Sequence, residues 1–220
     1  MLRPRKLLVF DLETVPDVAL ARDVWGEACE GLDDATVTQL IWDKMKEQSY
    51  GGSEFPRLPF HKIVAIGCLS ARIEDTQGGE SYHFERLGCI GEEGDDEATL
   101  LQTWYEYGAK QMRSGTPVRL VGFNSRGFDV PCLKVRALKH GVQASWLFQA
   151  GDKWSNYGAR YDAVWHVDVL DSLGDFGSSR SVAKTNAACP RNPDFIIFKP
   201  STCQHAFVKL KPSHAHIVQR

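Results

Sequence analysis

Short apolar runs alternate along this chain of 220 residues with segments whose apolar residues recur at helical spacing. Runs that are apolar on both faces, such as residues 6–12 and 62–69, predict strands buried inside a mixed or parallel sheet. The Gly78-Gly79 pair predicts a hairpin turn between the second strand and the third. In all, we predict five strands, at residues 6–12, 62–69, 80–87, 118–123 and 165–170.

Three helices are predicted between these strands. Asp33-Asp34 marks a helix start, and apolar residues at helical spacing continue from there to about Gln48. The acidic run at residues 92–97 predicts the start of a second helix, and residues 130–140 predict a third that Gly141 ends. Strands that alternate with helices indicate an α/β fold, with helices on the faces of the sheet.

Composition limits the class of protein. With 43% hydrophobic and 25% charged residues, the chain can form one globular domain with insertions. The net charge of -2 argues against general coating of nucleic acid but allows a local basic groove. The six cysteines lack zinc-site spacing, so we expect reduced, mostly buried thiols. No segment approaches the ~20 apolar residues that cross a bilayer, which predicts a soluble, cytoplasmic protein without a membrane partner.

Candidate chemistry begins where the first strand ends. Asp11 and Glu13 lie two residues apart, and alternate residues of a strand point to the same side. Asn124 and Asp129 follow the fourth strand, and ligands of α/β sheets gather at the carboxyl ends of strands. Such oxygen donors suit Mg²⁺ or Mn²⁺, two of which can clamp a phosphodiester. Each pair alone could instead be a solvated strand end or a turn.

Three stretches together resemble a known family. They read Val-Phe-Asp-Leu-Glu-Thr-Val-Pro-Asp at 9–17, Gly-Phe-Asn-Ser-Arg-Gly-Phe-Asp at 122–129 and Trp-His-Val-Asp-Val-Leu-Asp at 165–171. The first two resemble motifs of the DEDD exonucleases, whose fold is ribonuclease-H-like. Over about residues 5–184 the chain is similar to the bacterial family of predicted 3'-5' exonucleases related to the proofreading domain of family B DNA polymerases. The resemblance therefore implies a ribonuclease-H-like mixed sheet flanked by helices.

The resemblance also implies a reaction, in which phosphodiester bonds at the 3' end of nucleic acid, single-stranded DNA in the first place, are hydrolysed with two Mg²⁺ or Mn²⁺ ions. It makes three acids catalytic residues and metal ligands: Asp11, Glu13 and Asp129. It implies that Asn124 positions the substrate or the ligand loop, and Thr14, Phe123 and Phe128 are further candidate substrate-binding residues. Phe123, Phe128 and Trp154 are candidate stacking platforms for bases, with core packing as the alternative. Protein partners are not predicted.

One motif of the family is missing. A Tyr-x-x-x-Asp helix supplies the last metal ligand in the family, but here the residues four beyond Tyr157 and Tyr161 are Tyr161 and Trp165. His166 and Asp171 have the spacing of a related branch, yet the alternating valines predict a strand, in which the two side chains face opposite ways. Asp168 and Asp171 are additional candidate ligands, and Asp168 could instead accept hydrogen bonds from nearby backbone. A catalytically impaired nucleic-acid-binding remnant and a metal-dependent phosphohydrolase are therefore alternative functions.

The sequence changes character near its end. Residues 176–220 hold one acid, Asp194, against seven Lys or Arg, and four prolines exclude long helices there. We predict an exonuclease domain at 1–184 and an atypical basic tail at 185–220, which could contact phosphates or be a poorly ordered terminus. One hypothesis is that a shifted reading frame replaced the terminal helices, and sequencing of the encoding DNA would test it.

Overall fold

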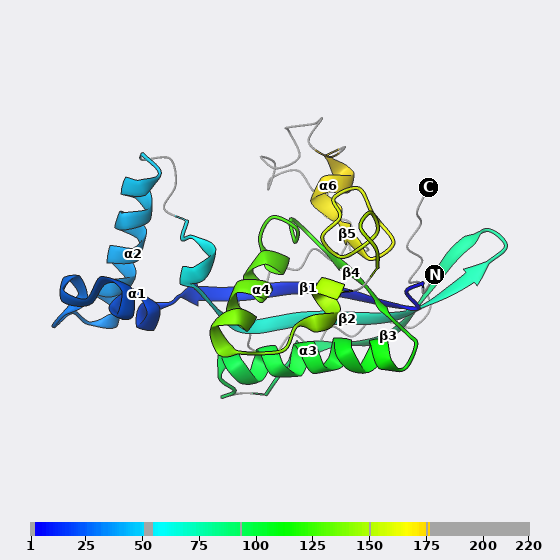
Figure 1. The fold of residues 1–220 in the computed structure, drawn as a ribbon, viewed down its shortest axis with the longest axis horizontal. Helices are drawn as coiled ribbons and strands as arrows, with labels where there is room; N and C mark the ends of the chain where they lie inside the picture. Colours follow the sequence, from blue (N-terminus) through cyan, green and yellow to red (C-terminus); the bar gives the residue numbers. More distant parts are fainter. Residues whose placement is uncertain (1–2, 51–54, 93, 150, 175, 177–220) are drawn as a thin grey trace, which may run out of the picture.

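A five-stranded mixed sheet, with the strand order β3-β2-β1-β4-β5, forms the centre of the computed structural model (Figure 1). The structure describes residues 3–50, 55–92, 94–149, 151–174 and 176. β1 runs antiparallel to β2 and parallel to β4, and β4 is parallel to β5. The strands are β1 Lys6–Pro16, β2 His61–Thr76, β3 Gly79–Ile90, β4 Val118–Gly122 and β5 His166–Asp168. The predicted ribonuclease-H-like α/β fold is confirmed.

Helices flank this sheet. They are α1 Val18–Trp25, α2 Asp34–Gln48, α3 Glu97–Arg113, α4 Asp129–His140, α5 Ser145–Gln149 and α6 Val169–Leu173, with single 3-10 turns at Gly26–Cys29 and Leu58–Phe60. The predicted starts of α2 and α3 are confirmed, because Asp33 and Asp96 accept hydrogen bonds from the first turns. Gly141 ends α4 in the left-handed conformation, as predicted. Within the described residues, no helix combines the length and apolar character needed to cross a bilayer.

Several sequence-based predictions differ from the structure: β1 and β2 continue past their predicted ends at residues 12 and 69, and the short helix α5 was not predicted. The strand predicted at 165–170 ends at Asp168, whose side chain accepts hydrogen bonds from the main-chain N–H groups of Leu170 and Asp171 and so starts α6. Helix α1 was not predicted, because it is only eight residues long and Ala21 is its single buried residue, so it has no apolar periodicity to recognise. The predicted boundary between residues 184 and 185 lies outside the described residues, as does the tail.

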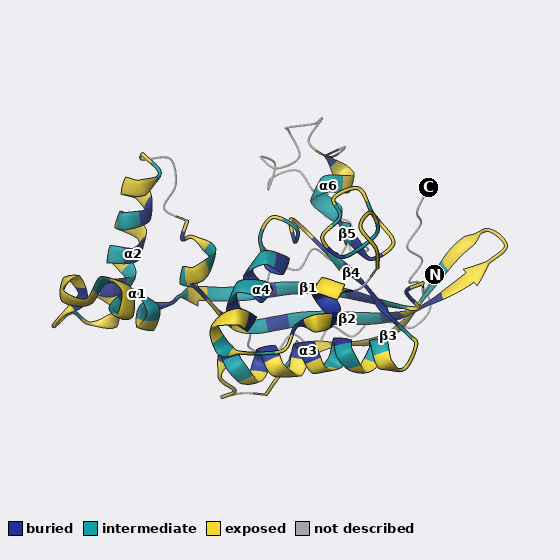
Figure 2. Cartoon of the chain, in the orientation of Figure 1, coloured by how far each residue is buried: buried dark blue, intermediate teal, exposed yellow. Residues whose placement is uncertain are grey.

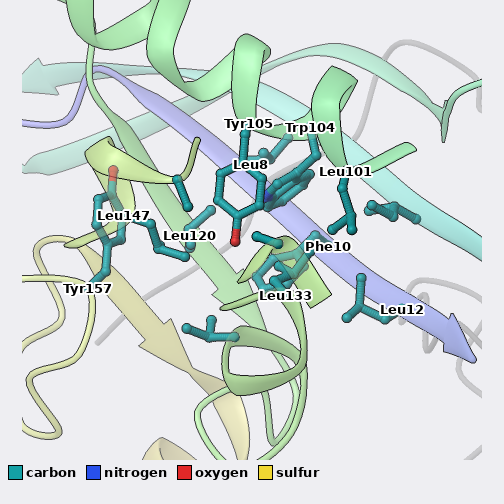
Figure 3. Packing of buried hydrophobic residues seen from close by; sticks show 14 of the residues in the cluster. Leu8, Phe10, Leu12, Leu101, Trp104, Tyr105, Leu120, Leu133, Leu147 and Tyr157 are labelled. Carbon is teal, nitrogen blue, oxygen red and sulfur yellow. The ribbon is translucent and has the colours of Figure 1, made fainter. Parts of the chain in front are cut away.

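The main core lies between the sheet and α3, α4 and α5. Leu8, Phe10 and Leu12 alternate along β1 and all point into it, and the Phe10 ring packs 5.1 Å from that of Trp104 on α3 (Figure 3). Because side chains of a strand alternate between its faces, Asp11 and Glu13 are turned away from this core. Buried positions follow the sheet and the inner sides of its helices (Figure 2).

Helices α1 and α2 form an arm that extends from the end of β1, beyond the helices that cover the sheet (Figure 1). The arm has a small core of its own, made by Ala21, Cys29, Val37, Ile41 and Met45. Asp17 lies where the arm joins the rest of the domain: it caps α1 and is 2% exposed. The arm is therefore joined to the domain through a buried charge.

That charge belongs to an ion cluster that holds α4 in place. Arg136 of α4 is 1% exposed, and its guanidinium donates to Glu97 at 2.7 Å and lies 2.7 Å from the Asp17 carboxylate. Glu97 also accepts the N–H of Ile63 at 2.7 Å, so the cluster links α3, α4 and β2. Burial opposes ionisation of Glu97, but hydrogen bonds from Arg136, Ile63 and His140 hold its pKa below the usual value.

We expect Glu97→Ala to destabilise the protein by about 3–5 kcal/mol, because the buried charge of Arg136 would keep only one of its two carboxylate partners, Asp17. For a domain of this size each kcal/mol corresponds to about 2–4 °C in Tm. Thermal unfolding followed by circular dichroism measures the effect. Asp75→Ala is the matched control: it breaks the exposed pair with Arg5 and should cost less than about 1 kcal/mol. Equal Tm values for the two variants would contradict the role of the cluster.

Candidate functional site

Asp11 and Glu13 lie where β1 passes beyond the end of β4. The pairing of β1 with β4 stops at Val9 and Val121, and β4 itself ends at Gly122. Past this point β1 keeps its partner β2 on one side only, with Asp11 opposite Gly67 and Glu13 opposite Ala65. Both acidic residues are half-buried. The two acids therefore lie inside β1, which continues to Pro16, and not at its end as predicted; what ends beside them is the pairing with β4.

Asp129 comes from a distant part of the chain to the same place. It is the first residue of α4, is 4% exposed, and its Oδ1 accepts the N–H of Leu12 at 3.2 Å. Leu12 N–H also lies against the carboxylate of Asp11. Two carboxylates 118 residues apart in sequence thus meet at one main-chain amide.

The pKa values of all three acids are raised, and the charge of Asp11 contributes to the shifts of Asp129 and Glu13. Burial and, next, the negative charge of Asp11 raise the pKa of Asp129 to about 7. Burial raises the pKa of Asp11, against the hydrogen bond from Leu12. Burial and the charge of Asp11 likewise raise the pKa of Glu13. Among the described residues, no Lys, Arg or His forms an ion pair with Asp11, Glu13 or Asp129. The negative charge of the site is therefore not neutralised by a neighbouring basic side chain.

These residues suit a hard divalent cation. Carboxylate oxygens are the ligands of Mg²⁺ and Mn²⁺, and Mg²⁺ commonly takes one or two carboxylates together with waters and substrate phosphate oxygens. No cluster of three or more His, Cys, Asp or Glu side chains close enough to enclose an ion occurs among the described residues. An ion at these acids would therefore complete its coordination with waters and substrate phosphate oxygens.

The loop before Asp129 is shaped by Asn124 and Gly127. Asn124 has a positive φ of 57°, and its carbonyl accepts the N–H groups of Gly127 at 3.0 Å and Phe128 at 3.1 Å. A Cβ on Gly127 would lie 2.6 Å from Asn124 Oδ1, so a larger residue there would require the Asn124 side chain to move. Asn124 thus has a loop-building position, and contact of its side chain with substrate remains a prediction.

Asp168 anchors this loop from β5. Its Oδ1 accepts the N–H of Asn124 at 2.9 Å and its Oδ2 that of Arg126 at 2.8 Å, in addition to its bonds to the start of α6. Asp168 is 3% exposed. Asp171 lies 3.5 Å from Arg126 and 3.7 Å from Arg160. Both additional candidates therefore have protein partners in the described structure, and metal ligation by either is still a prediction.

Sequence reasoning missed Arg126 and Ser125. The Arg126 guanidinium donates to the carbonyls of Ala159 at 2.7 Å and Asp162 at 2.9 Å, and also to that of His166. Ser125 is fully buried, with its hydroxyl 2.8 Å from His166 Nε2. His166 is the packed strand residue predicted, and burial lowers its pKa to about 4. Arg and Ser in a glycine-containing turn carry no periodic signal, so no pattern identified them.

The aromatic candidates differ in exposure. Phe123 is 56% exposed and Trp154 is 78% exposed, so the core-packing alternative is wrong for these two. Phe128 is half-buried, with its ring centroid 4.8 Å from that of His61. Thr14 directly follows Glu13, and its hydroxyl lies 3.0 Å from His61 Nδ1. Phe128 and Thr14 therefore meet at one histidine that the sequence had not indicated.

Comparison with known proteins assigns a family. Residues 53–191 match the profile of a family described as predicted 3'-5' exonuclease related to the exonuclease domain of PolB, and this range is 139 of the 220 residues. The chain belongs to this family. The matched range includes Asn124 and Asp129, whereas Asp11 and Glu13 precede it.

Among solved structures, the family B DNA polymerase from the hyperthermophilic archaeon Pyrobaculum calidifontis is similar to this PolB-related chain. The TM-score is 0.40 and the sequence identity 18%, and the match covers 79% of this chain. It covers 16% of the polymerase chain, so this chain spans about a sixth of that length. No curated protein sequence matches it.

We expect Asp129→Asn to raise Tm at pH 8 without divalent metal. The folded-state pKa of about 7 lies above the usual 3.8, so the stability linked to this carboxyl is complete below pH 3.8 and is lost as the pH rises through 7. Asparagine removes the charge and keeps an oxygen for Leu12 N–H. The gain should be a few degrees at pH 8, smaller at pH 5 and absent below pH 3.8, where the carboxyl is protonated in both the folded and the unfolded state.

Differential scanning calorimetry with EDTA measures this gain. Asp23→Asn, at an exposed position of α1, is the control and should leave Tm unchanged at both pH values. Adding Mn²⁺ at pH 8 should stabilise the wild type and not the Asp129 variant. A lower Tm for Asp129→Asn at pH 8 would contradict the prediction, because it would show that the ionised Asp129 carboxylate does not destabilise the folded protein.

Proposed function

We propose that the protein is a metal-dependent 3'-5' exonuclease that releases mononucleotides from the 3' ends of single-stranded DNA in the cytoplasm. The observation that carries the proposal is the meeting of Asp11 and Asp129 at Leu12 N–H, with the pKa of Asp129 raised to about 7. Family membership supports the reaction class. The proposal gives Asp11, Glu13 and Asp129 the role of holding two Mg²⁺ or Mn²⁺ ions.

Bound at these oxygens, the ions would supply a water of lowered pKa and positive charge to stabilise the phosphorane-like transition state. The chain's own residues do the positioning. Asp129 is held by the start of α4 and by Leu12, and Asp11 is held by the pairing of β1 with β2, so both carboxylates stand in place before substrate arrives. Above pH 7, where Asp129 is ionised, a bound cation would relieve their mutual repulsion, which supports metal dependence.

Substrate contacts are proposed for the residues next to these acids. Phe128 offers a half-buried ring beside Asp129, and Phe123, 56% exposed, offers a second ring in the same loop. Aromatic faces stack on any base, which suits an exonuclease without sequence preference. Thr14 offers a hydroxyl beside Glu13, and Asn124 stands at the start of the loop.

A second candidate, an impaired exonuclease that binds nucleic acid, is favoured by one observation. The family's catalytic tyrosine has no counterpart among the described residues: Tyr157 is fully buried and donates its hydroxyl to the carbonyl of Val118, and Tyr161 is 76% exposed beside Phe176. Without a tyrosine to orient water, turnover would be slow even where metal and DNA bind.

Incubation of the full chain with 5'-labelled single-stranded DNA and Mn²⁺ tests both candidates. We expect a ladder that shortens from the 3' end, and a loss of about 100-fold or more in Asp11→Asn, Glu13→Gln and Asp129→Asn, because the metals contribute several kcal/mol. Asp23→Asn is the control and should keep full activity. A gel shift without shortening would support the impaired candidate. Shortening that all three variants retain would overturn the site assignment.

A further inference from the structure

Three rings pack together next to the acids. His61, the first residue of β2, is 4% exposed, and its ring centroid lies 4.7 Å from that of Phe55 and 4.8 Å from that of Phe128. The two phenylalanine rings are 5.4 Å apart. Phe55 is 62% exposed and Phe128 half-buried, so the cluster has a buried histidine and an aromatic outer surface.

The cluster borders the acids through both chain segments that carry them. Phe128 immediately precedes Asp129, and Thr14, which hydrogen-bonds to His61, immediately follows Glu13. If the phosphate of a nucleotide lies at the acids, its sugar and base lie a few ångströms from that phosphate. Neighbouring residues of a strand are about as far apart, so Thr14 and Phe128 are at a suitable distance. The cluster is thus placed to contact the terminal nucleotide.

Hydrogen bonds determine the tautomer of His61. Its Nε2 lies 3.0 Å from the carbonyl of Pro56, and because a carbonyl only accepts, Nε2 carries the hydrogen. In a neutral ring Nδ1 is then an acceptor, and it lies 3.0 Å from Thr14 Oγ1. Burial lowers the pKa of His61, and the positive charge of Arg136 also acts in this direction, so the ring stays neutral at physiological pH.

The consequence falls on Thr14. Its hydroxyl has one hydrogen, and His61 Nδ1 takes it, so the Thr14 oxygen can only accept a hydrogen bond from any other group. An oxygen restricted to accepting favours a hydroxyl donor on the ligand. The free 3'-hydroxyl of a nucleic acid strand is such a donor.

We infer that His61 is a positioning residue that orients the Thr14 hydroxyl to accept the terminal 3'-hydroxyl and that supports Phe55 and Phe128 as the surface for the terminal base. The inference rests on the proposed exonuclease function and adds its end specificity. The enzyme should therefore prefer strands that end in a 3'-hydroxyl over strands that end in a 2',3'-dideoxynucleotide.

Equilibrium binding tests this without turnover. The full chain is titrated, with Ca²⁺ in place of Mg²⁺, into two 5'-fluorescein single-stranded oligonucleotides that differ only in the terminal 3'-hydroxyl, and anisotropy is recorded. We expect the wild type to bind the hydroxyl end about 3- to 10-fold more tightly. Thr14→Val and His61→Phe should each abolish that preference, and their combination should change it no further.

Two further variants separate positioning from folding. Thr14→Ser keeps a hydroxyl and should restore the preference, and His83→Phe, which replaces a half-exposed histidine paired with Glu74 on the β2–β3 hairpin, should leave it intact. If His61→Phe melts before the assay temperature, Thr14→Val alone decides, because it leaves the ring cluster in place. A terminal 2-aminopurine should be quenched on binding to the wild type and less so in Phe55→Leu.

The outcomes distinguish the two proposals. No binding to either oligonucleotide, together with no degradation in Mn²⁺, overturns the exonuclease function and this inference with it. Degradation in Mn²⁺ combined with equal affinity for both ends overturns the inference alone. A preference that Thr14→Val keeps also overturns it, since the hydroxyl would then be recognised elsewhere.

Discussion

The main-chain amide of Leu12 is the point on which the site depends. Pairing between β1 and β4 stops at Val9 and Val121, so this amide has no strand partner on that side and donates to Asp129 instead. The Leu12 N–H, left without a partner where β4 ends, thereby binds Asp129, the first residue of α4, 117 residues further along the chain. Two like charges are brought together, one buried and one half-buried, and a bound cation would offset the cost of that arrangement.

Helix α4 has to be held firmly for this contact to persist. At its N-terminal side the loop is tied to β5, because Asp168 accepts the N–H groups of Asn124 and Arg126. One to two turns into the helix, Arg136 joins Glu97 and Asp17 in a buried ion cluster. Both attachments are made by charged side chains shielded from water. Such buried polar contacts fix the position of a helix more narrowly than apolar contacts do. Asp129 is thus positioned from two directions.

Much of this could be predicted from periodicity and local chemistry. Caps such as Asp33 and Gly141 act on neighbouring residues, so they can be recognised from their own segments. The same holds for Asp11 and Glu13, which continue an apolar run, and for Asp129, which comes after one. His61 and Arg126 could not be found this way, because neither belongs to a repeating pattern. The Thr14 hydroxyl bonded to His61 lies 47 residues away, and the carbonyls bonded to Arg126 lie 33 or more residues away. The end of β5 was misjudged for a related reason: alternating valines favour a strand, but the Asp168 side chain stabilises a helical turn.

The double use of Asp17 has a practical consequence for anyone redesigning this chain. Asp17 both caps α1 and neutralises Arg136 and Lys139, so the projecting arm and the helix that begins with Asp129 share one carboxylate. Removing the arm together with Asp17 would take away the counter-charge of Lys139 and one of the two counter-charges of Arg136. A minimal version of the domain would have to retain that acid on a short bridging loop, or replace both cations with apolar side chains.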